Sequence, residues 1–168
     1  MSITMYQASA PVLKRTLSNL VVILEKGAAH AEARKIDPSV LLGSRLFPDM
    51  FALTRQVQIA TDMSKGCVAR LAGDEPVKLE DGETTFAELI ARVKKVISII
   101  DGYKPEQIDG SEGRDIVLKS PRGDMQFKGL AYLQGFVLPN VYFHVTTTYN
   151  ILRHNGVELG KMDFIGQP

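Results

Sequence analysis

Apolar residues recur every three or four positions in four long segments of this chain, and this spacing constrains the fold more than any other feature. Such a period places the apolar side chains on one face of an α-helix, whereas a half-buried strand would need strict alternation. The segments cover residues 6–30, about 47–72, 85–101 and about 130–154. Four amphipathic helices in 168 residues predict a mainly all-α protein, an antiparallel four-helix bundle formed as a single domain over residues 1–168.

Residues at the ends of these segments set where the helices are expected to begin and end. Thr85 and Glu88 match a capping box, in which each side chain accepts a hydrogen bond from the other residue's backbone N–H, so a helix is expected to begin there. Gly73, Gly102 and Gly156 stand where the second, third and last helices are expected to stop, because glycine readily adopts the conformation that ends many helices.

Prolines indicate a helix start, a loop and a kink. Residues 47–49 are interpreted as the entry to the second helix. Residues 37–39 are interpreted as a loop, because the residue before a proline avoids helical geometry. Pro139 has no backbone N–H and therefore predicts a kink in the last helix between residues 138 and 140.

Residues 114–128 depart from the helical period. Two short runs typical of strands, residues 116–118 and 125–127, flank a turn that contains Pro121 and Gly123. This arrangement predicts a small β-hairpin outside the bundle.

Composition narrows the classes of partner. The chain has 20 Lys and Arg against 19 Asp and Glu, interspersed along its length, so no basic patch for nucleic acid is expected. Cys67 is the only cysteine, which excludes an internal disulfide and predicts a buried, inert thiol in a reducing compartment. No signal peptide and no run of about 20 apolar residues is visible, so we expect a cytoplasmic protein without a membrane span.

The three histidines differ in their surroundings. His30 and His154 are interpreted as surface residues near helix ends, where a cation favours the helix dipole. His144 lies among apolar residues in the middle of the last helix, where a buried imidazole needs a hydrogen-bond partner. Asn140 lies one turn before it and Thr148 one turn after it, on the same helix face.

Polar residues on the second helix are candidates for that partner. Gln58 and Asp62 share one face of this helix. If the face meets the last helix, Gln58, Asp62, Asn140 and His144 form a buried polar cluster. Two interpretations stay open: the four residues bond only to one another or to water, or His144 ligates a metal. Motifs for phosphate binding, zinc proteases and nucleophilic hydrolases are absent from the sequence.

Residues 138–157, LPNVYFHVTTTYNILRHNGV, resemble an uncharacterised bacterial and fungal family of unknown function that is grouped with the DinB/YfiT-like superfamily of metalloenzymes. The similarity extends to residues 35–41, 48–51, 55–60 and 83–89, and so covers nearly the whole chain. The resemblance implies a bundle of the DinB/YfiT-like type.

Members of this superfamily typically bind a divalent metal through three histidines, one on the second helix and two spaced four apart on the last. The resemblance puts His144 at the final ligand position and Asn140 at its partner, with the second-helix ligand at Gln58 or, alternatively, Gln56. Two of the three imidazoles are then amides, which are weak ligands for Zn²⁺ or Ni²⁺. The implied cofactor is none, or a weakly held divalent metal with His144, Asn140, Gln58 and Asp62 as candidate ligands.

Two function classes lead, and a metal-independent enzyme or a purely structural dimeric protein stays open beside them. The first is a binding or accessory protein with an inner polar pocket, an unknown small-molecule ligand and no three-histidine metal site. The alternative is a divergent metal-dependent enzyme, similar to a hydrolase or thiol transferase, that uses His144. The aromatic last helix and the pairing habit of the superfamily also lead us to expect a homodimer.

Overall fold

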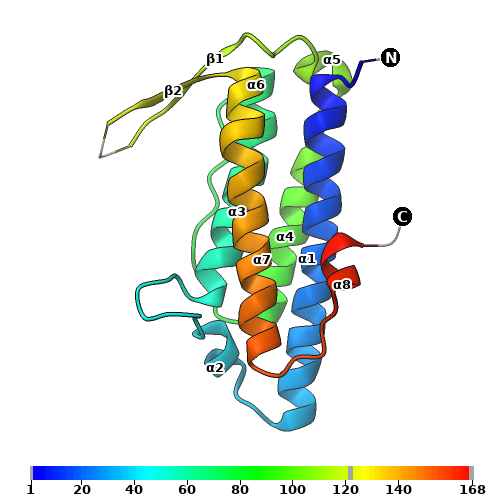
Figure 1. Ribbon diagram of the computed structural model, residues 1–168, viewed down its shortest axis with the longest axis vertical. Coiled ribbons are helices and arrows are strands. Elements are labelled where there is room, and N and C mark those ends of the chain that lie inside the picture. Colours follow the sequence, from blue (N-terminus) through cyan, green and yellow to red (C-terminus); the bar gives the residue numbers. More distant parts are fainter. Residues whose placement is uncertain (1, 121–122, 167–168) are drawn as a thin grey trace.

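Four long helices form the centre of the computed structural model, which describes residues 2–120 and 123–166 (Figure 1). They are α1 (Met5–Arg34), α3 (Leu53–Ala72), α4 (Phe86–Asp101) and α7 (Leu138–His154). Helix α1 packs mainly against α4, and α3 packs against both α7 and α4. The mainly helical bundle expected from the apolar period is confirmed.

The apolar stripes meet in one core. Ten of the expected positions are fully buried: Leu13, Leu17, Leu20, Leu24, Leu53, Val57, Leu71, Leu89, Val93 and Val96. Burial of each such side chain contributes about 1.5–3 kcal/mol to the free energy of folding, so these apolar faces provide most of the driving force for folding of the bundle. Cys67 is also fully buried, and burial raises the pKa of its thiol to about 12, which keeps it protonated and unreactive at neutral pH.

The expected helix ends are largely present. Thr85 Oγ1 accepts from the Glu88 N–H at 3.2 Å, and Glu88 Oε2 accepts from the Thr85 N–H at 2.9 Å, as in the predicted capping box. Gly73 ends α3 in the left-handed conformation with φ 89°. Thr4 and Gln7 form a second capping box at the start of α1, which the apolar pattern did not predict.

Two predictions between α1 and α3 were wrong. Residues 37–39 do not form a loop but start the short helix α2 (Pro38–Leu42), because the Asp37 carboxylate accepts from the Ser39 N–H at 2.9 Å and proline suits the first helical position. Residues 47–49 do not begin α3, which starts at Leu53. Phe47 and Phe51 are exposed and make no core contact that would hold an earlier helical turn.

The last helical segment has three parts. Helix α6 (Gly129–Tyr132) is followed by the π-helical turn η1 (Leu133–Val137) and then by α7. The departure from α-helical geometry lies at Leu133–Val137, before residues 138–140, where the kink was predicted. Pro139 stands in the first turn of α7, where the missing N–H is tolerated. Gly156, with φ 89°, follows the end of α7 as expected.

The predicted hairpin is present. Strands β1 (Asp115–Leu118) and β2 (Met125–Lys128) pair antiparallel, with Ile116 opposite Phe127. Residues 121 and 122 of the predicted turn lie outside the described residues. Figure 1 shows the hairpin projecting from one end of the bundle.

Two further short helices, besides α2, were not predicted. Helix α5 (Pro105–Ile108) follows α4, and α8 (Lys161–Ile165) lies against α1. Lys26 bridges Asp163 at 2.7 Å, and Asn19 donates to the Phe164 carbonyl at 2.9 Å, so side chains of α1 hold α8 in place. Within residues 2–120 and 123–166, no helix combines the length and apolar character needed to cross a bilayer.

Replacing Gly73 with alanine tests the end of α3. A left-handed φ costs a residue with a Cβ about 1–2 kcal/mol, and the added Cβ would overlap the Arg114 guanidinium. We expect Gly73→Ala to lower the free energy of unfolding in urea by about 1–2 kcal/mol. Gly113→Ala is the control, because no atom lies near its added Cβ, and it should change stability by less than about 0.5 kcal/mol. Equal effects of the two substitutions would contradict this account.

Candidate functional site

His144 lies inside the bundle, where α7 meets α3. It is 8% exposed, and its Nδ1 lies 2.6 Å from Oε1 of Gln56 on α3. The Gln56 amide nitrogen donates to the Phe51 carbonyl at 2.9 Å, which fixes which end of the amide faces the imidazole. The expectation that His144 is buried and bonded to a side chain of this helix is confirmed.

The contact with Gln56 determines the chemistry of the imidazole. Because Oε1 of Gln56 can only accept, Nδ1 of His144 carries the proton and Nε2 carries the lone pair. Burial, and then the positive charge of Arg55, lowers the pKa of His144, so the ring is neutral at neutral pH. His144 is thus equipped to accept a hydrogen bond or a proton at Nε2, or to act as a single metal ligand.

The predicted cluster of Gln58, Asp62, Asn140 and His144 is not formed. Residues two apart on a helix point about 200° away from each other, so when Gln56 faces α7, Gln58 faces the opposite side. Gln58 donates to Glu83 Oε2 at 2.9 Å. The spacing of four between Gln58 and Asp62 was interpreted correctly, but their shared face meets α4.

Asn140 is also separate from His144. Its side-chain amide donates to the Phe136 carbonyl at 2.6 Å, within the π turn that precedes it. Thr148 is fully buried and donates to the backbone carbonyl of His144 at 2.9 Å. Both polar residues beside His144 on its helix are therefore used by the helix backbone.

A buried arginine on α4 gathers the polar residues that face away from α7. Arg92 is 4% exposed and donates to Thr61 Oγ1 at 2.8 Å and to the Glu80 carbonyl at 2.9 Å. It also pairs with three carboxylates, those of Asp62 at 2.9 Å, Asp81 at 3.1 Å and Glu83 at 2.9 Å. This network was not predicted from the sequence, although Arg92 lies among the apolar positions Leu89, Val93 and Val96, a pattern that indicates burial.

The network shifts two pKa values. Burial alone would raise the pKa of Glu83, but hydrogen bonds from Gln58 and Arg92 outweigh it and lower that pKa. Burial alone would likewise lower the pKa of Arg92, but its bond to Glu83 and the charges of Asp62, Glu83 and Asp81 raise it. Glu83 and Arg92 therefore stay ionised near neutral pH, and the contacts of Arg92 attach residues 80–83 to the bundle.

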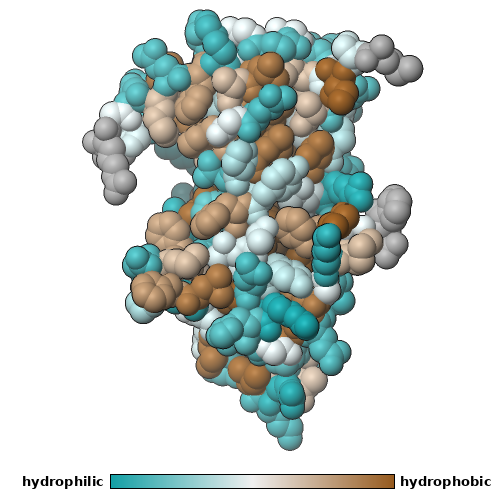
Figure 2. All heavy atoms as spheres, viewed as in Figure 1, coloured by the Kyte–Doolittle hydropathy of each residue, from teal (hydrophilic) through white to brown (hydrophobic). Residues whose placement is uncertain are grey.

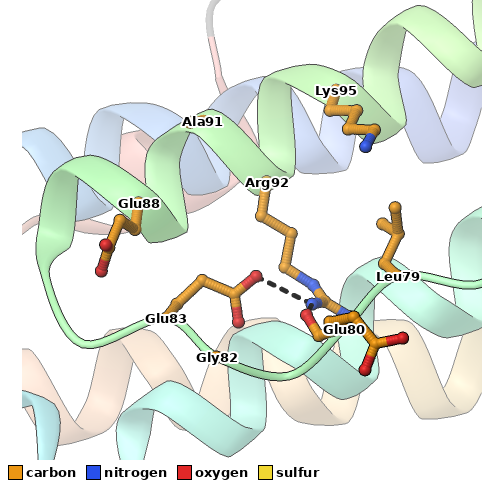
Figure 3. A pocket seen from close by; sticks show the side chains of 8 residues that line it. All are labelled: Leu79, Glu80, Gly82, Glu83, Glu88, Ala91, Arg92 and Lys95. Atoms are coloured by element: carbon orange, nitrogen blue, oxygen red, sulfur yellow. Dashed lines mark hydrogen bonds and ion pairs between the residues drawn. The ribbon is translucent and has the colours of Figure 1, made fainter.

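Beside this network lies a hollow of about 370 Å³, lined by Leu79, Glu80, Gly82, Glu83, Glu88, Ala91, Arg92 and Lys95 (Figure 3). Figure 3 shows the Arg92 side chain crossing from α4 to the loop and meeting Glu83. Glu88 is bonded to the backbone of Thr84 and Thr85. Most charged groups at this hollow are already paired within the fold.

A second hollow, which we call the hairpin groove, runs along α3 beneath the hairpin and has a volume of about 420 Å³. Its lining residues are Arg55, Ile59, Asp62, Met63, Lys65, Arg70, Pro76, Leu118, Lys119, Met125 and Phe136. Figure 1 shows the hairpin extending outward on the side of α3, and Figure 2 shows the outline of the molecule indented below it. Arg55, which lowers the pKa of His144, stands at the start of this groove along α3.

The side chains at the implied ligand positions do not fit a three-imidazole metal site. The carbonyl oxygen of Gln56 already accepts from His144, and the amide nitrogen of Asn140 faces a backbone carbonyl. One imidazole with two neutral amides is a poor ligand set for Zn²⁺ or Ni²⁺. In the part of the chain that the structure describes, no three His, Cys, Asp or Glu side chains are grouped so as to hold a metal ion.

The other histidines lie away from His144. The prediction that His30 ends a helix was wrong, because α1 continues to Arg34, and His30 lines a surface hollow with Gly156 and Glu158. His154 is exposed in the last turn of α7, as expected.

Comparisons with known proteins identify a family and a solved structure with a similar fold. Residues 5–165 match the model of a family described as a domain of unknown function, DUF1993. The crystal structure of a DinB family member protein from Shewanella denitrificans is similar to this chain, with 41% sequence identity, coverage of 97% of this chain and 92% of that one, and a TM-score of 0.88. No protein among those with curated descriptions matches the chain.

Removing the Arg92 side chain tests the network at the α3 and α4 contact. Arg92→Met should lower the free energy of unfolding by about 3–5 kcal/mol, because Glu83 and Asp62 would lose their main buried cation. Lys95→Met is the control, since Lys95 lines the same hollow from the surface, and we expect less than about 0.5 kcal/mol from it. Urea unfolding of both variants measures the difference, and a loss below about 1 kcal/mol for Arg92→Met would contradict the assigned role.

The pH dependence of stability tests the neutral state of His144. Its pKa in the folded protein lies below the ordinary value of 6.5, so the unfolded chain binds a proton more readily. The stability that depends on the neutral ring is complete above pH 6.5 and is lost as pH falls below it toward the folded pKa.

Urea unfolding at about pH 7.5 and about pH 5.5 should therefore show a larger loss for the native protein than for His144→Gln. The comparison between the two proteins cancels the titration of the other groups. A folded-state pKa of His144 at or above 6.5, measured by NMR titration of the ring, would be the opposite of the expected result.

Proposed function

Because the chain belongs to the family described as a domain of unknown function, DUF1993, and shares its fold with a DinB family member, we propose that it is a ligand-binding or accessory protein that works without a three-histidine metal site. The observation that carries this proposal is the contact between Gln56 and His144. The two amides at the implied ligand positions are bonded within the protein, and a single imidazole remains.

The hairpin groove supports the binding part of the proposal. Its volume of about 420 Å³ lies within the range of small-molecule sites, and it combines apolar side chains with a few charged ones. Its walls come from α3, the hairpin and the π turn, and such junctions between elements often hold ligands. The groove also begins at Arg55, close enough to influence the neutral His144.

The orientation of His144 favours a second candidate function, that of a metal-dependent enzyme. The proton on Nδ1 of His144 is held by a carbonyl oxygen, which is the arrangement that orients a histidine for ligation through Nε2. A divergent metal-dependent enzyme that uses His144 with water molecules is therefore the alternative proposal. It requires ligands beyond the described His, Cys, Asp and Glu side chains, which form no group of three around a common point.

Metal content separates the two candidates. We expect protein purified without a histidine tag to contain less than about 0.1 equivalent of Zn, Ni, Fe or Mn per chain by elemental analysis. We also expect its melting temperature to be unchanged by a chelator, because no folding energy comes from a metal. His144→Ala is the matched variant and should have the same metal content as the native protein.

A bound metal would contradict the proposed function. About one equivalent of metal per chain in the native protein, lost in His144→Ala, would overturn the proposal and support the metal-dependent enzyme. Asn150→Ala, on an exposed position of the same helix, controls for a general effect of substitution on α7.

A further inference from the structure

We propose that the hairpin groove binds a small molecule with one anionic head group and an apolar body, and that Arg70 and Lys119 hold the head group. This inference rests on the proposed binding function and names the chemistry of its ligand. Four cationic side chains line the groove, from Arg55, Lys65, Arg70 and Lys119, whereas Asp62 is the one carboxylate in its lining. Asp62 is already paired with both Arg92 and Lys65.

Arg70 is held in place by the fold. Its Nη1 donates to the hydroxyl of Tyr132 at 3.0 Å, and Tyr132 is fully buried. Burial raises the pKa of Tyr132 to about 12, so the hydroxyl stays protonated and serves as a neutral acceptor for the guanidinium. Arg70 is therefore positioned without losing its charge to a carboxylate.

Gly66 makes room for this arrangement. It lies one turn before Arg70 on α3, and a Cβ at this position would overlap Nη1 of Arg70. The guanidinium thus lies along the helix surface above Gly66. Within the described residues, Nε and Nη2 of Arg70 make no hydrogen bond, so two donor groups are left for a ligand. A preorganised guanidinium binds a carboxylate or phosphate at a low cost in side-chain entropy.

Lys119 stands at the same end of the groove. Lys119, Arg70 and Pro76 line both the groove and the neighbouring hollow, which places the two cations at the junction. Lys119 is exposed and forms no ion pair with any residue in the described ranges. Besides these two cations, the neighbouring hollow is lined by Arg114 and by three carboxylates, those of Asp74, Glu75 and Asp115. The carboxylates outnumber the added cation and would repel a second negative charge. These charges favour a ligand with a single anionic head.

The groove also has apolar lining residues, which would contact the body of the ligand. Ile59 and Met63 contribute from α3, Phe136 from the π turn, and Leu118 and Met125 from paired positions of the hairpin. Phe136 is supported from behind by Phe127 and Tyr132, at ring centroid distances of 5.2 Å and 6.1 Å. Two methionines give the floor an adaptable shape, which suits a flexible alkyl chain.

The hollow beside Arg92 is less suited to an anion. Glu80, Glu83 and Glu88 line it, and Arg92 is fully engaged with Thr61, Glu80 and three carboxylates. An anionic ligand there would compete with pairs that hold the bundle together. In the hairpin groove, Arg55 is paired with Asp81 and Lys65 with Asp62. Arg70 and Lys119 hold no such structural pair among the described residues.

Calorimetric titration with three ten-carbon probes tests the proposal: decanoate, decyl phosphate and decanol, each kept below micelle formation. We expect decanoate or decyl phosphate to bind at least tenfold more tightly than decanol, because decanol lacks the charge. The stronger of the two anions identifies the head group as carboxylate or phosphate. Equal binding of decanol, or no binding of either anion, would overturn the inference.

Variants locate the head group. Arg70→Ala and Lys119→Ala should each weaken binding of the anionic probe about tenfold, and Gly66→Ala should weaken it by displacing the Arg70 guanidinium. Arg153→Ala removes the same charge from an exposed position at the end of α7 and should leave binding unchanged. Circular dichroism checks that each variant is folded. Arg70→Gln or Lys119→Gln, which remove the charge but keep a polar side chain of similar length, replace an alanine variant that is not.

NMR locates the alkyl chain of the bound probe. The methyl NMR signals of Met63 and Met125 should shift on addition of the probe, whereas the Met162 methyl on α8 should not. Unchanged binding in both Arg70→Ala and Lys119→Ala, or unchanged signals of Met63 and Met125, would contradict the proposed site. A metal-free protein that binds neither anion would overturn this inference alone, whereas stoichiometric metal would overturn the proposed function.

Discussion

The contact between α3 and α4 through buried Arg92 is the constraint on which the site geometry depends. The guanidinium meets Asp62 on α3 together with Asp81 and Glu83 in the connection that follows it. A buried arginine is tolerated only with such partners, because an unpaired buried charge costs several kcal/mol. With Asp62 directed toward α4, the rotation of α3 about its own axis is determined.

That rotation divides α3 into three faces with different roles. Gln56 turns toward α7 and meets His144, while Gln58 turns toward α4 and meets Glu83. Arg55, Ile59 and Met63 line the hairpin groove on a third face. The buried polar pair, the ion-pair network and the groove are thus consequences of one helix orientation.

The buried polar groups at the positions that the resemblance implied as metal ligands are satisfied within the fold. A histidine that faces an amide is satisfied without a metal, since Oε1 of Gln56 accepts its proton and the Phe51 carbonyl accepts from the amide nitrogen. Asn140 satisfies a carbonyl of the π turn before Pro139. The amides at the implied ligand positions therefore have structural partners, and the fold does not need a metal to balance its buried polar groups.

The sequence by itself determined the four amphipathic helices, the Thr85 and Glu88 cap, the hairpin at residues 114–128 and the burial of His144, because each depends on local spacing or on apolar neighbours along the chain. It did not determine the partner of His144, which lies 88 residues away on α3. A small rotation of α3 about its axis changes which of its side chains faces α7, and the sequence does not set that rotation. Gln58 and Asp62 were candidate partners of His144 on the condition that their face met the last helix, and that face meets α4 instead. Only the tertiary structure decided that Gln56 faces α7, that Arg92 gathers three carboxylates, and that Gly66 leaves space for Arg70, because these contacts join segments whose relative positions are set by packing.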